Sequence, residues 1–367
     1  MNEWEKVKLG EVLKEVNERN KGEKVKRVLS VTNSRGFVNQ EEYFEGTVHS
    51  ANISNYKIVR KNQFAYNPSR VNVGSIDILK DYEEGALSPM YIVFEVDTTK
   101  LLPDYFKYYF QTNRFFENVK NNTQGSVRNS LSFKALADFD YLLPTIEEQE
   151  KIVNLLKEID YIIKKYEKLL KEKKQFIKAQ FVEMFENEEY PKDILKNLSK
   201  EIYAGGDKPK DISQSQDEEY LYPVFANGYE NQGLQGYSKK YKTEDEAVTI
   251  SARGTIGYSF IRKGKFTPIV RLITIIPNEK VNVIYLKYAI DNLNIAGSGT
   301  SQAQLTVPSI KKHKIILPPM ELQNKFTDIV KQVDKQKFLL EQQKQNYENL
   351  RKGLMQKLLT GKVRVKI

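Results

Sequence analysis

Cysteine is absent from the 367-residue sequence, and histidine occurs only at His49 and His313. The lack of cysteine excludes disulfide scaffolds, cysteine nucleophiles and thiolate metal sites. With two imidazoles in the whole chain, a zinc site rich in histidine is excluded as well. Nucleophilic and acid–base catalysis therefore have few candidate residues here.

Long apolar runs are also missing. No uninterrupted apolar stretch approaches the roughly 20 residues of a membrane span, and residues 1–6 contain no apolar signal segment. Trp4 is the single tryptophan, but 22 tyrosines and 18 phenylalanines supply enough aromatic surface for a core. The length favours two to three domains, and 40% hydrophobic with 29% charged residues indicates a folded protein, which we expect to be cytoplasmic.

Motifs of enzymes that act on DNA or nucleotides are not found. Residues 67–70 read Asn-Pro-Ser-Arg, which departs from the Asn-Pro-Pro-aromatic loop that adenine methyltransferases use to hold a flipped base. No Gly-x-Gly turn follows a predicted strand, and residues 264–266 lack the remainder of a phosphate-binding loop. Glu172 and Lys174 fit the end of a nuclease motif, but a charged helix face explains them better. An enzyme with an unrecognised site has no support in the sequence.

Basic residues exceed acidic ones, 58 to 48, which gives a net charge of +10. The excess lies mainly in the second half of the chain. Residues 191–316 carry +5 and residues 317–367 carry +6, whereas residues 1–146 carry only +1. This distribution favours a polyanionic partner, although a solvated surface with a modest charge excess explains it equally well.

The sequence contains an internal repeat. Residues 142–160 (LLPTIEEQEKIVNLLKEID) match residues 316–334 (ILPPMELQNKFTDIVKQVD) at a constant offset of 174. Upstream, Arg70 corresponds to Arg253 at an offset of 183. The changing offset indicates loop insertions, so we predict two half-chains, each with an irregular segment followed by a long helix.

Each predicted helix follows a Leu-Pro pair and carries an apolar seam. Thr145 and Glu148 predict a capping box at the start of the first helix. Apolar residues then recur at coiled-coil spacing, and Gln336 and Gln343 are predicted in the second column of the later seam. The seam residues are Ile152, Leu156, Ile159, Ile163, Tyr166 and Leu170, and then Val333, Leu340, Tyr347 and Leu354. Forty residues form a helix of roughly 60 Å, and the repeat predicts that the two helices pair in antiparallel order.

The segments before the helices contain short β-prone runs separated by Gly, Asn and Ser. These runs are residues 26–31, 91–96, 247–250 and 269–276, and the helical stretches between them are residues 103–118 and 283–294. The predicted fold class is α+β, with two similar α+β domains separated and joined by two long α-helices that form an antiparallel coiled coil with a pseudo-two-fold repeat. The predicted boundaries are 1–144 and 188–317 for the domains, and 145–187 and 318–367 for the helices with the C-terminal tail.

These motifs resemble the specificity subunits of type I restriction–modification systems over essentially the whole chain. The motif Leu-Pro-x-x-Glu-x-Gln opens both long helices, as in the two helical regions of that family. The other matching segments are residues 222–228 and 235–237, the loops 125–128 and 297–300, and the C-terminal residues 358–365. Leu322 departs from the family, which usually carries an acidic residue before the glutamine, and the first helix lacks the Thr-Gly-Lys tail.

The resemblance implies a non-catalytic subunit. Each target-recognition domain would read one half of a split site in double-stranded DNA, and the helix pair would fix the spacing between the half-sites. The helices would also dock modification (adenine methyltransferase) subunits, two of them by analogy with the family, and restriction subunits would join the larger complex. No cofactor is expected in this chain, whereas S-adenosylmethionine, and ATP with Mg, are expected in the partner subunits.

Candidate DNA contacts are polar side chains in loops or beside glycines. Arginine suits guanine, and asparagine or glutamine suits adenine. The candidates are Ser34, Arg35, Arg70, Asn72, Arg128 and Asn129 in the first domain and Asn227, Arg253, Arg271, Gln302 and Gln304 in the second. Arg70 and Arg253 are favoured because they hold equivalent places in the repeat, and for each candidate the alternative is a solvated loop side chain or turn former. Lysines in 239–242 and 311–314 are possible phosphate contacts.

Two other functions remain open at the level of sequence. A structural coiled-coil adaptor that binds only proteins would explain the helices, but not two duplicated domains that carry Arg, Asn and Gln. A specificity subunit that serves a fused methyltransferase–nuclease partner would have a similar sequence. Steep salt dependence of DNA binding would separate a DNA reader from the adaptor.

Overall fold

A computed structural model describes residues 4–43, 49–123, 130–186, 189–254, 256–293, 295 and 304–365. The chain divides into two compact units. The first unit consists of Met1–Tyr166 and Gln343–Ile367, and the second consists of Glu167–Gln342. Each unit thus takes part of both long helices, and each is described by itself. No described helix combines the length and apolar character that crossing a membrane requires.

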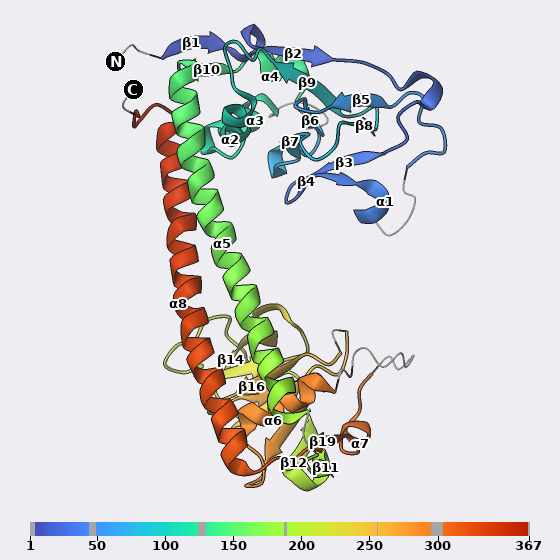
Figure 1. Cartoon of the computed structure of the whole chain (residues 1–367), viewed down its shortest axis with the longest axis vertical. Helices are drawn as coiled ribbons and strands as arrows, with labels where there is room; N and C mark the ends of the chain where they lie inside the picture. The colour runs from blue at the N-terminus through green and yellow to red at the C-terminus, as the bar shows by residue number, and fades with distance from the viewer. Residues whose placement is uncertain are drawn as a thin grey trace. The chain divides into compact units, whose positions relative to one another are not determined.

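The first unit is built on a four-stranded antiparallel sheet with the order β2-β9-β6-β7. Its strands are β1 (Glu5–Lys8), β2 (Leu13–Val16), β3 (Leu29–Thr32), β4 (Gly36–Asn39), β5 (Lys57–Arg60), β6 (Phe64–Tyr66), β7 (Ile76–Ile78), β8 (Glu84–Leu87), β9 (Ile92–Val96) and β10 (Asp140–Leu143). Its short helices are α1 (Gln40–Tyr43), α2 (Pro103–Tyr109), α3 (Asn113–Thr123) and α4 (Phe133–Ala137). Figure 1 labels these elements.

Aromatic rings form the centre of the first unit's core. Phe64 and Phe94 stack across adjacent strands with ring centroids 5.2 Å apart, and Phe106 of α2 meets Phe64 edge-on at 5.8 Å. All three rings are fully buried. Because burial of one such side chain stabilises the fold by about 1.5–3 kcal/mol, this cluster anchors α2 on the sheet.

The second unit repeats the sheet of the first, with the order β12-β18-β15-β16. Its strands are β11 (Lys192–Ile194), β12 (Ser199–Ala204), β13 (Tyr222–Phe225), β14 (Leu234–Ser238), β15 (Ala247–Ile250), β16 (Ser259–Arg262), β17 (Thr267–Pro268), β18 (Ile273–Pro277) and β19 (Lys314–Ile316). Its short helices are α6 (Val283–Asn292) and α7 (Val307–Ile310). The core gathers Phe181, Phe185, Tyr285 and Phe326 around the start of α6.

A buried glutamine explains the duplicated motif. The Oε1 atom of Gln149 accepts the backbone N–H of Leu102 at 2.8 Å, and its Nε2 donates to the carbonyl oxygens of Lys100 and Pro144. Gln323 makes the same three bonds in the second unit, with Asn282, Lys280 and Pro318. One amide group thus ties the loop before the short helix to the Leu-Pro turn. The internal repeat is therefore a repeat of structure.

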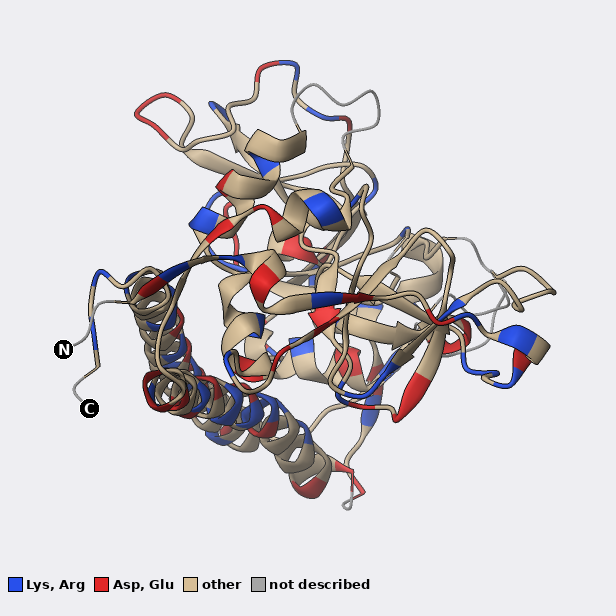
Figure 2. Ribbon diagram, turned by 90° about the horizontal axis from the view of Figure 1, so that it is seen from above, with Lys and Arg blue, Asp and Glu red and all other residues tan. Residues whose placement is uncertain are grey.

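The two long helices are α5 (Ile146–Phe185) and α8 (Met320–Leu358), as the apolar seam predicted. They run antiparallel in each unit. In the first unit Tyr166 faces Tyr347 with ring centroids 5.8 Å apart, and in the second Phe181 faces Phe326 at 5.5 Å. Basic and acidic residues are interspersed along both helices (Figure 2).

Three local predictions from the sequence were wrong. Gln336 and Gln343 are exposed, so neither forms the second seam column. The helix expected at 103–118 is two helices, because Thr112 interrupts it and its hydroxyl accepts the N–H of Phe115 at 3.2 Å. In the capping box only Thr145 acts as expected, by accepting the N–H of Glu148 at 3.3 Å. The carboxylate of Glu148 binds elsewhere.

Candidate nucleic-acid interface

In the second unit, hydrogen bonds bring three loops together at Asn227. Its Nδ2 donates to the carbonyl oxygen of Val270 at 2.6 Å, and its Oδ1 accepts the N–H of Ala252 at 2.7 Å. Both ends of the amide are therefore bound to the backbone. Asn227 therefore holds the backbone at Val270 and at Ala252 in place. The next residue along the chain from each is a predicted DNA contact, Arg271 or Arg253.

Arg253 and Gln304 form a pair. The guanidinium Nη2 donates to Oε1 of Gln304 at 2.9 Å, while Arg253 itself is exposed. The chain next to Gln304 is fixed by the N–H of Leu305, which donates to the carbonyl oxygen of Ala252 at 2.9 Å. Four predicted residues, Asn227, Arg253, Arg271 and Gln304, thus share one surface, which we call the second-unit cluster.

Backbone strain marks the tip of this cluster. Val270 and Arg271 both have left-handed conformations, with φ of 51° and 64°. Val270 is nevertheless 47% exposed, so burial of its side chain does not explain the conformation. Hydrogen bonds to the carbonyl oxygens of Gly206 and Gly205 hold the two residues in place. A β-branched residue held in this region is uncommon and is found mostly where function requires it.

The sequence predicted a β-strand over residues 269–276, and this prediction was wrong for the first four residues. The strand β18 begins only at Ile273, because the strained turn occupies the preceding residues. Glycine is required beside this turn. A Cβ atom on Gly205 would lie 2.7 Å from the backbone of Pro268 and Ile269. The close approach of the two backbones therefore sets the position of Arg271.

In the first unit, the candidates lie on two neighbouring turns. Ser34 and Arg35 are exposed in the turn between β3 and β4, and Arg35 lies 5.5 Å from the ring of Tyr43. Arg70 and Asn72 are exposed in the loop between β6 and β7. This loop reaches the β3–β4 turn, since a Cβ placed on Gly74 of the loop would lie 3.8 Å from Cβ of Asn33, the neighbour of Ser34.

Three of the predicted residues, Arg128, Asn129 and Gln302, lie outside the described residues. The chain next to the first two can still be placed, because the N–H of Leu131 donates to the carbonyl oxygen of Pro68 at 3.1 Å. This bond matches the Leu305–Ala252 bond of the second unit. Equivalent loops therefore converge in the two copies.

Sequence reasoning did not identify Arg262, a buried basic residue of β16 in the second unit. Its side chain is buried at 3% exposure, and its guanidinium lies 3.6 Å from the ring of Phe225. It donates to the hydroxyl of Thr249 and to the carbonyl oxygen of Gln232. Burial lowers the pKa of Arg262 to about 10. Its place in a short run of basic residues had hidden this structural role.

The described residues contain no group of three or more His, Asp or Glu side chains placed to hold a metal ion. The acidic residues 217–219 form a turn in which the carboxylate of Asp217 accepts the N–H groups of Glu219 and Tyr220. Lys239, a proposed phosphate contact, pairs instead with Glu219 at 2.5 Å.

Comparison with known proteins identifies the family. The family model described as "Type I restriction modification DNA specificity domain" matches residues 1–175 and 195–347. The chain belongs to the type I restriction–modification DNA specificity family. Its two matches contain most of the two repeated domains and the long helices, which agrees with the α+β class and the pseudo-two-fold repeat.

Several relatives carry the name of a type I specificity subunit. One, from Mycoplasma pneumoniae, is 32% identical over 206 residues, which is 54% of this chain and 56% of that relative. This chain thus spans little more than half the length of that relative, and 41% of another from the same organism. The specificity subunit of type I restriction enzyme MjaVIII, from Methanocaldococcus jannaschii, is 25% identical over 99% of this chain and 94% of its own.

Solved structures share the fold. A chain from a study of complex assembly and conformational transition in a type I restriction–modification system has a TM-score of 0.64 at 15% identity and covers 99% of both chains. The type I specificity subunit of M. genitalium has a TM-score of 0.52 at 14% identity, over 97% of this chain and 96% of its own. These likenesses support the duplicated α+β fold with long helices.

Proposed function

We propose that this DNA-specificity chain is the non-catalytic recognition subunit of a type I restriction–modification complex. In this proposal each unit reads one half of a bipartite site in double-stranded DNA. One observation carries it: the same fold occurs twice, and in both copies an equivalent loop presents an exposed arginine, Arg70 or Arg253. Two similar readers joined by a constant connection match two half-sites separated by a constant gap.

The helix pair supplies the gap in this proposal. Helix α5 has 40 residues and α8 has 39, so each corresponds to roughly 60 Å at 1.5 Å per residue. B-DNA repeats every 10–10.5 bp, and a fixed separation therefore also fixes the rotational phase of the two readers on the duplex. Such a device selects spacing as well as sequence.

The long helices also offer surface for the proposed modification subunits, of which we expect two. Six large apolar side chains on them are exposed: Tyr161, Phe176, Met320, Phe338, Leu339 and Leu350. Exposed apolar groups on helices of this length are typical of surfaces that bind other proteins. Restriction subunits would join the larger complex. In this proposal S-adenosylmethionine, and ATP with Mg, act in the partner chains, which include a fused methyltransferase–nuclease where the system has one.

The experiment that tests this function is a comparison of methylated bases across the host genome with and without the gene. We expect loss of adenine methylation at one split motif, two short half-sites around a fixed gap. If no motif changes, DNA binding by the purified full-length chain becomes decisive. A chain that then shows no salt-dependent DNA binding would be an adaptor between proteins.

A further inference from the structure

A groove in the second unit runs between its globular domain and its part of the helix pair. Its volume is about 1250 Å³, and α5, α6, α8 and β16 form its walls. At one edge the rings of Tyr229 and Tyr258 are in contact at a tilted angle of 55°, with centroids 4.8 Å apart. The charged groups of the lining are two aspartates and six lysines, Lys174, Lys178, Lys263, Lys287, Lys331 and Lys337. The groove is therefore strongly basic.

Both aspartates are already neutralised. Asp291 pairs with Lys287 at 2.5 Å, and Asp334 pairs with Lys337 at 2.9 Å. Four exposed lysines of the lining remain, Lys331 and three lysines whose side chains are unpaired within the described part of the chain. Lys174, Lys178 and Lys263 have no ion pair or hydrogen bond with any described residue.

In the first unit, the lysines at the equivalent positions form ion pairs within the domain. There Asp104, on α2, pairs with Lys80 at 3.0 Å and also with Lys157 of α5. This carboxylate thus binds both lysines at once, at the place in the first unit that is equivalent to the groove of the second. The lysines consequently have a structural role in the first unit.

The second unit keeps these lysines without the carboxylate. At the repeat's offsets of 183 and 174, Lys80 corresponds to Lys263 and Lys157 to Lys331. Asp104 corresponds to Ile284 at an offset of 180, which is the offset at which the two segments bind the buried glutamines. All three of these second-unit residues line the groove. Ile284 cannot pair with a lysine, and Lys331 pairs only weakly with Asp328 of its own helix, at 3.8 Å. The lysines of the second copy are thus available to an anion from outside the chain.

We infer that this groove holds the phosphate backbone of duplex DNA next to the half-site read by the second unit, an inference that rests on the proposed function. The groove is continuous with the second-unit cluster. The carbonyl oxygen of Tyr258 accepts the N–H of Ser251 at 2.9 Å, and the hydroxyl of Ser251 accepts the N–H of Gly228, the neighbour of Asn227. Base-reading and phosphate-binding surfaces lie side by side in most DNA-binding proteins, because phosphate contacts orient the reader.

The test replaces Lys174, Lys178 and Lys263 together with glutamine in the full-length chain. Binding to duplex DNA of mixed sequence is measured by fluorescence anisotropy at a series of KCl concentrations. Each lost phosphate contact reduces the slope of log affinity against log salt by about 0.9, so we expect the slope to fall by roughly 2–3. Preference for the target motif over mixed DNA is expected to stay unchanged.

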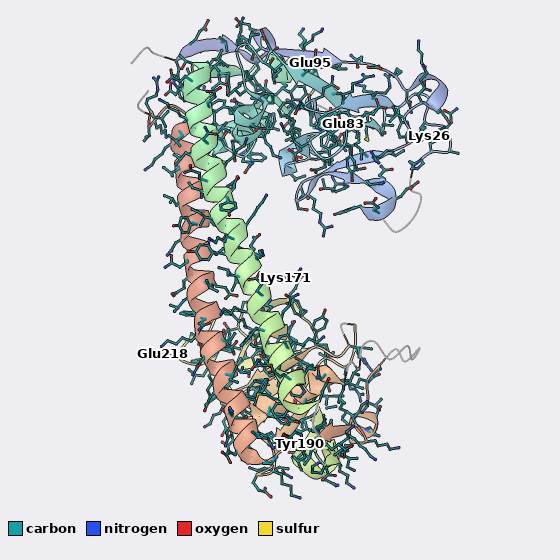
Figure 3. The ribbon with its side chains drawn as sticks, in the orientation of Figure 1. Lys26, Glu83, Glu95, Lys171, Tyr190 and Glu218 are labelled. Carbon is teal, nitrogen blue, oxygen red and sulfur yellow. The ribbon has the colours of Figure 1, made fainter. Side chains whose placement is uncertain are left out.

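A matched control removes the same charge from exposed lysines of the second unit that lie outside the groove. Lys171, which is labelled on α5 in Figure 3, Lys200 and Lys335 are each replaced by glutamine. The control is expected to keep a slope within about one unit of the wild type. Circular dichroism verifies that both variants fold.

Three outcomes would overturn the inference. Equal slopes in the groove variant and the control would show that the groove does not contact phosphates. An unchanged slope with loss of binding to the methyltransferase subunits would assign the groove to an acidic protein surface. If the wild-type chain shows no salt-dependent DNA binding, the proposed function fails and this inference fails with it.

Discussion

Glu148 shows how a single residue acquires a role that its motif did not predict. Its carboxylate is fully buried and accepts hydrogen bonds from Nε1 of Trp4 at 2.8 Å and from Nη2 of Arg364 at 2.7 Å. In the second unit Leu322 stands in its place, and Tyr190, labelled in Figure 3, stands in the place of Trp4. Arg364 belongs to the C-terminal tail. The first long helix is not followed by such a tail, so the second unit has no equivalent of Arg364 to pair with a carboxylate. This explains why an apolar residue, Leu322, replaces the acidic residue that the family usually carries there.

Replacement of Glu148 by glutamine should make the first unit less stable in a pH-dependent way. Burial alone would raise the pKa of Glu148, but the hydrogen bonds from Arg364 and Trp4 outweigh it and hold the pKa below its ordinary value. This stabilisation is fully present above pH 4.5, the ordinary pKa, and is lost as the pH falls through the lowered pKa of the folded state. At pH 7 we expect a loss of about 2 kcal/mol.

The fluorescence of Trp4 during unfolding in urea measures this loss directly. Trp4 is the single tryptophan, and it contacts both Glu148 and Arg364. The difference between wild type and E148Q should shrink between pH 5 and the acid limit of folding. Glu150→Gln is the control, because Glu150 is exposed on the same helix. A difference that is equally large at acid pH would contradict the role assigned to the carboxylate.

Arg253 is the candidate DNA contact with the most defined surroundings among the described residues. In the repeat it is equivalent to Arg70. In the structure it is exposed, and a hydrogen bond to Gln304 orients its guanidinium. Under the proposed function, R253A should reduce discrimination between target and mixed DNA by about 1–3 kcal/mol, roughly 5- to 150-fold. Competition binding measures this ratio. Lys208→Ala, an exposed control in the same unit, should leave the ratio unchanged, and a similar loss in both variants would argue against base reading.

Among the structural elements, periodic ones could be predicted from the sequence and strained ones could not. The seams of α5 and α8 repeat often enough to define both helices. The turn at Val270 and Arg271 resembles β-strand in composition, because its conformation depends on Gly205 and Gly206, which are more than 60 residues away in the sequence. The same limit applies to Asn227, whose partners lie 25 and 43 residues away. Long-range backbone contacts of this kind leave no local signal.

Because the turn is strained, two similar substitutions should change the free energy of unfolding in opposite directions. Val270→Gly should stabilise the protein by about 1 kcal/mol, because glycine adopts positive φ without steric cost. Val73 is also exposed, at 52%, and lies in the β6–β7 loop of the first unit without positive φ. Val73→Gly should therefore destabilise by a similar amount. Calorimetric unfolding of both variants measures the signs, and equal destabilisation would show that the turn at Val270 is unstrained.

At the scale of the whole molecule, the first unit is formed by two separate stretches of sequence, and the second unit is the continuous stretch between them. The first unit contains the start of α5 and the end of α8, which Arg351 of α8 joins by an ion pair to Asp160 of α5. The second unit contains the other parts of both helices. The sequence predicted this pairing because the repeat, the chain order and the two seams all favour antiparallel helices. The residues that bind them to each domain, such as Arg351 and Gln149, follow from tertiary contacts alone.

The proposed spacing function predicts the result of lengthening both helices together. One heptad inserted after Tyr166 in α5 and one before Gln343 in α8 keep the seam in register, because seven residues complete almost two turns. Each helix then grows by about 10.5 Å, which corresponds to roughly 3 bp of B-DNA. The methylated motif should keep both half-sites and gain about 3 bp between them. Insertion into α5 alone should abolish methylation, since it misaligns the pair, while a heptad of altered surface residues at constant length should leave the gap unchanged. An unchanged gap after the double insertion would mean that some other part of the complex sets the spacing.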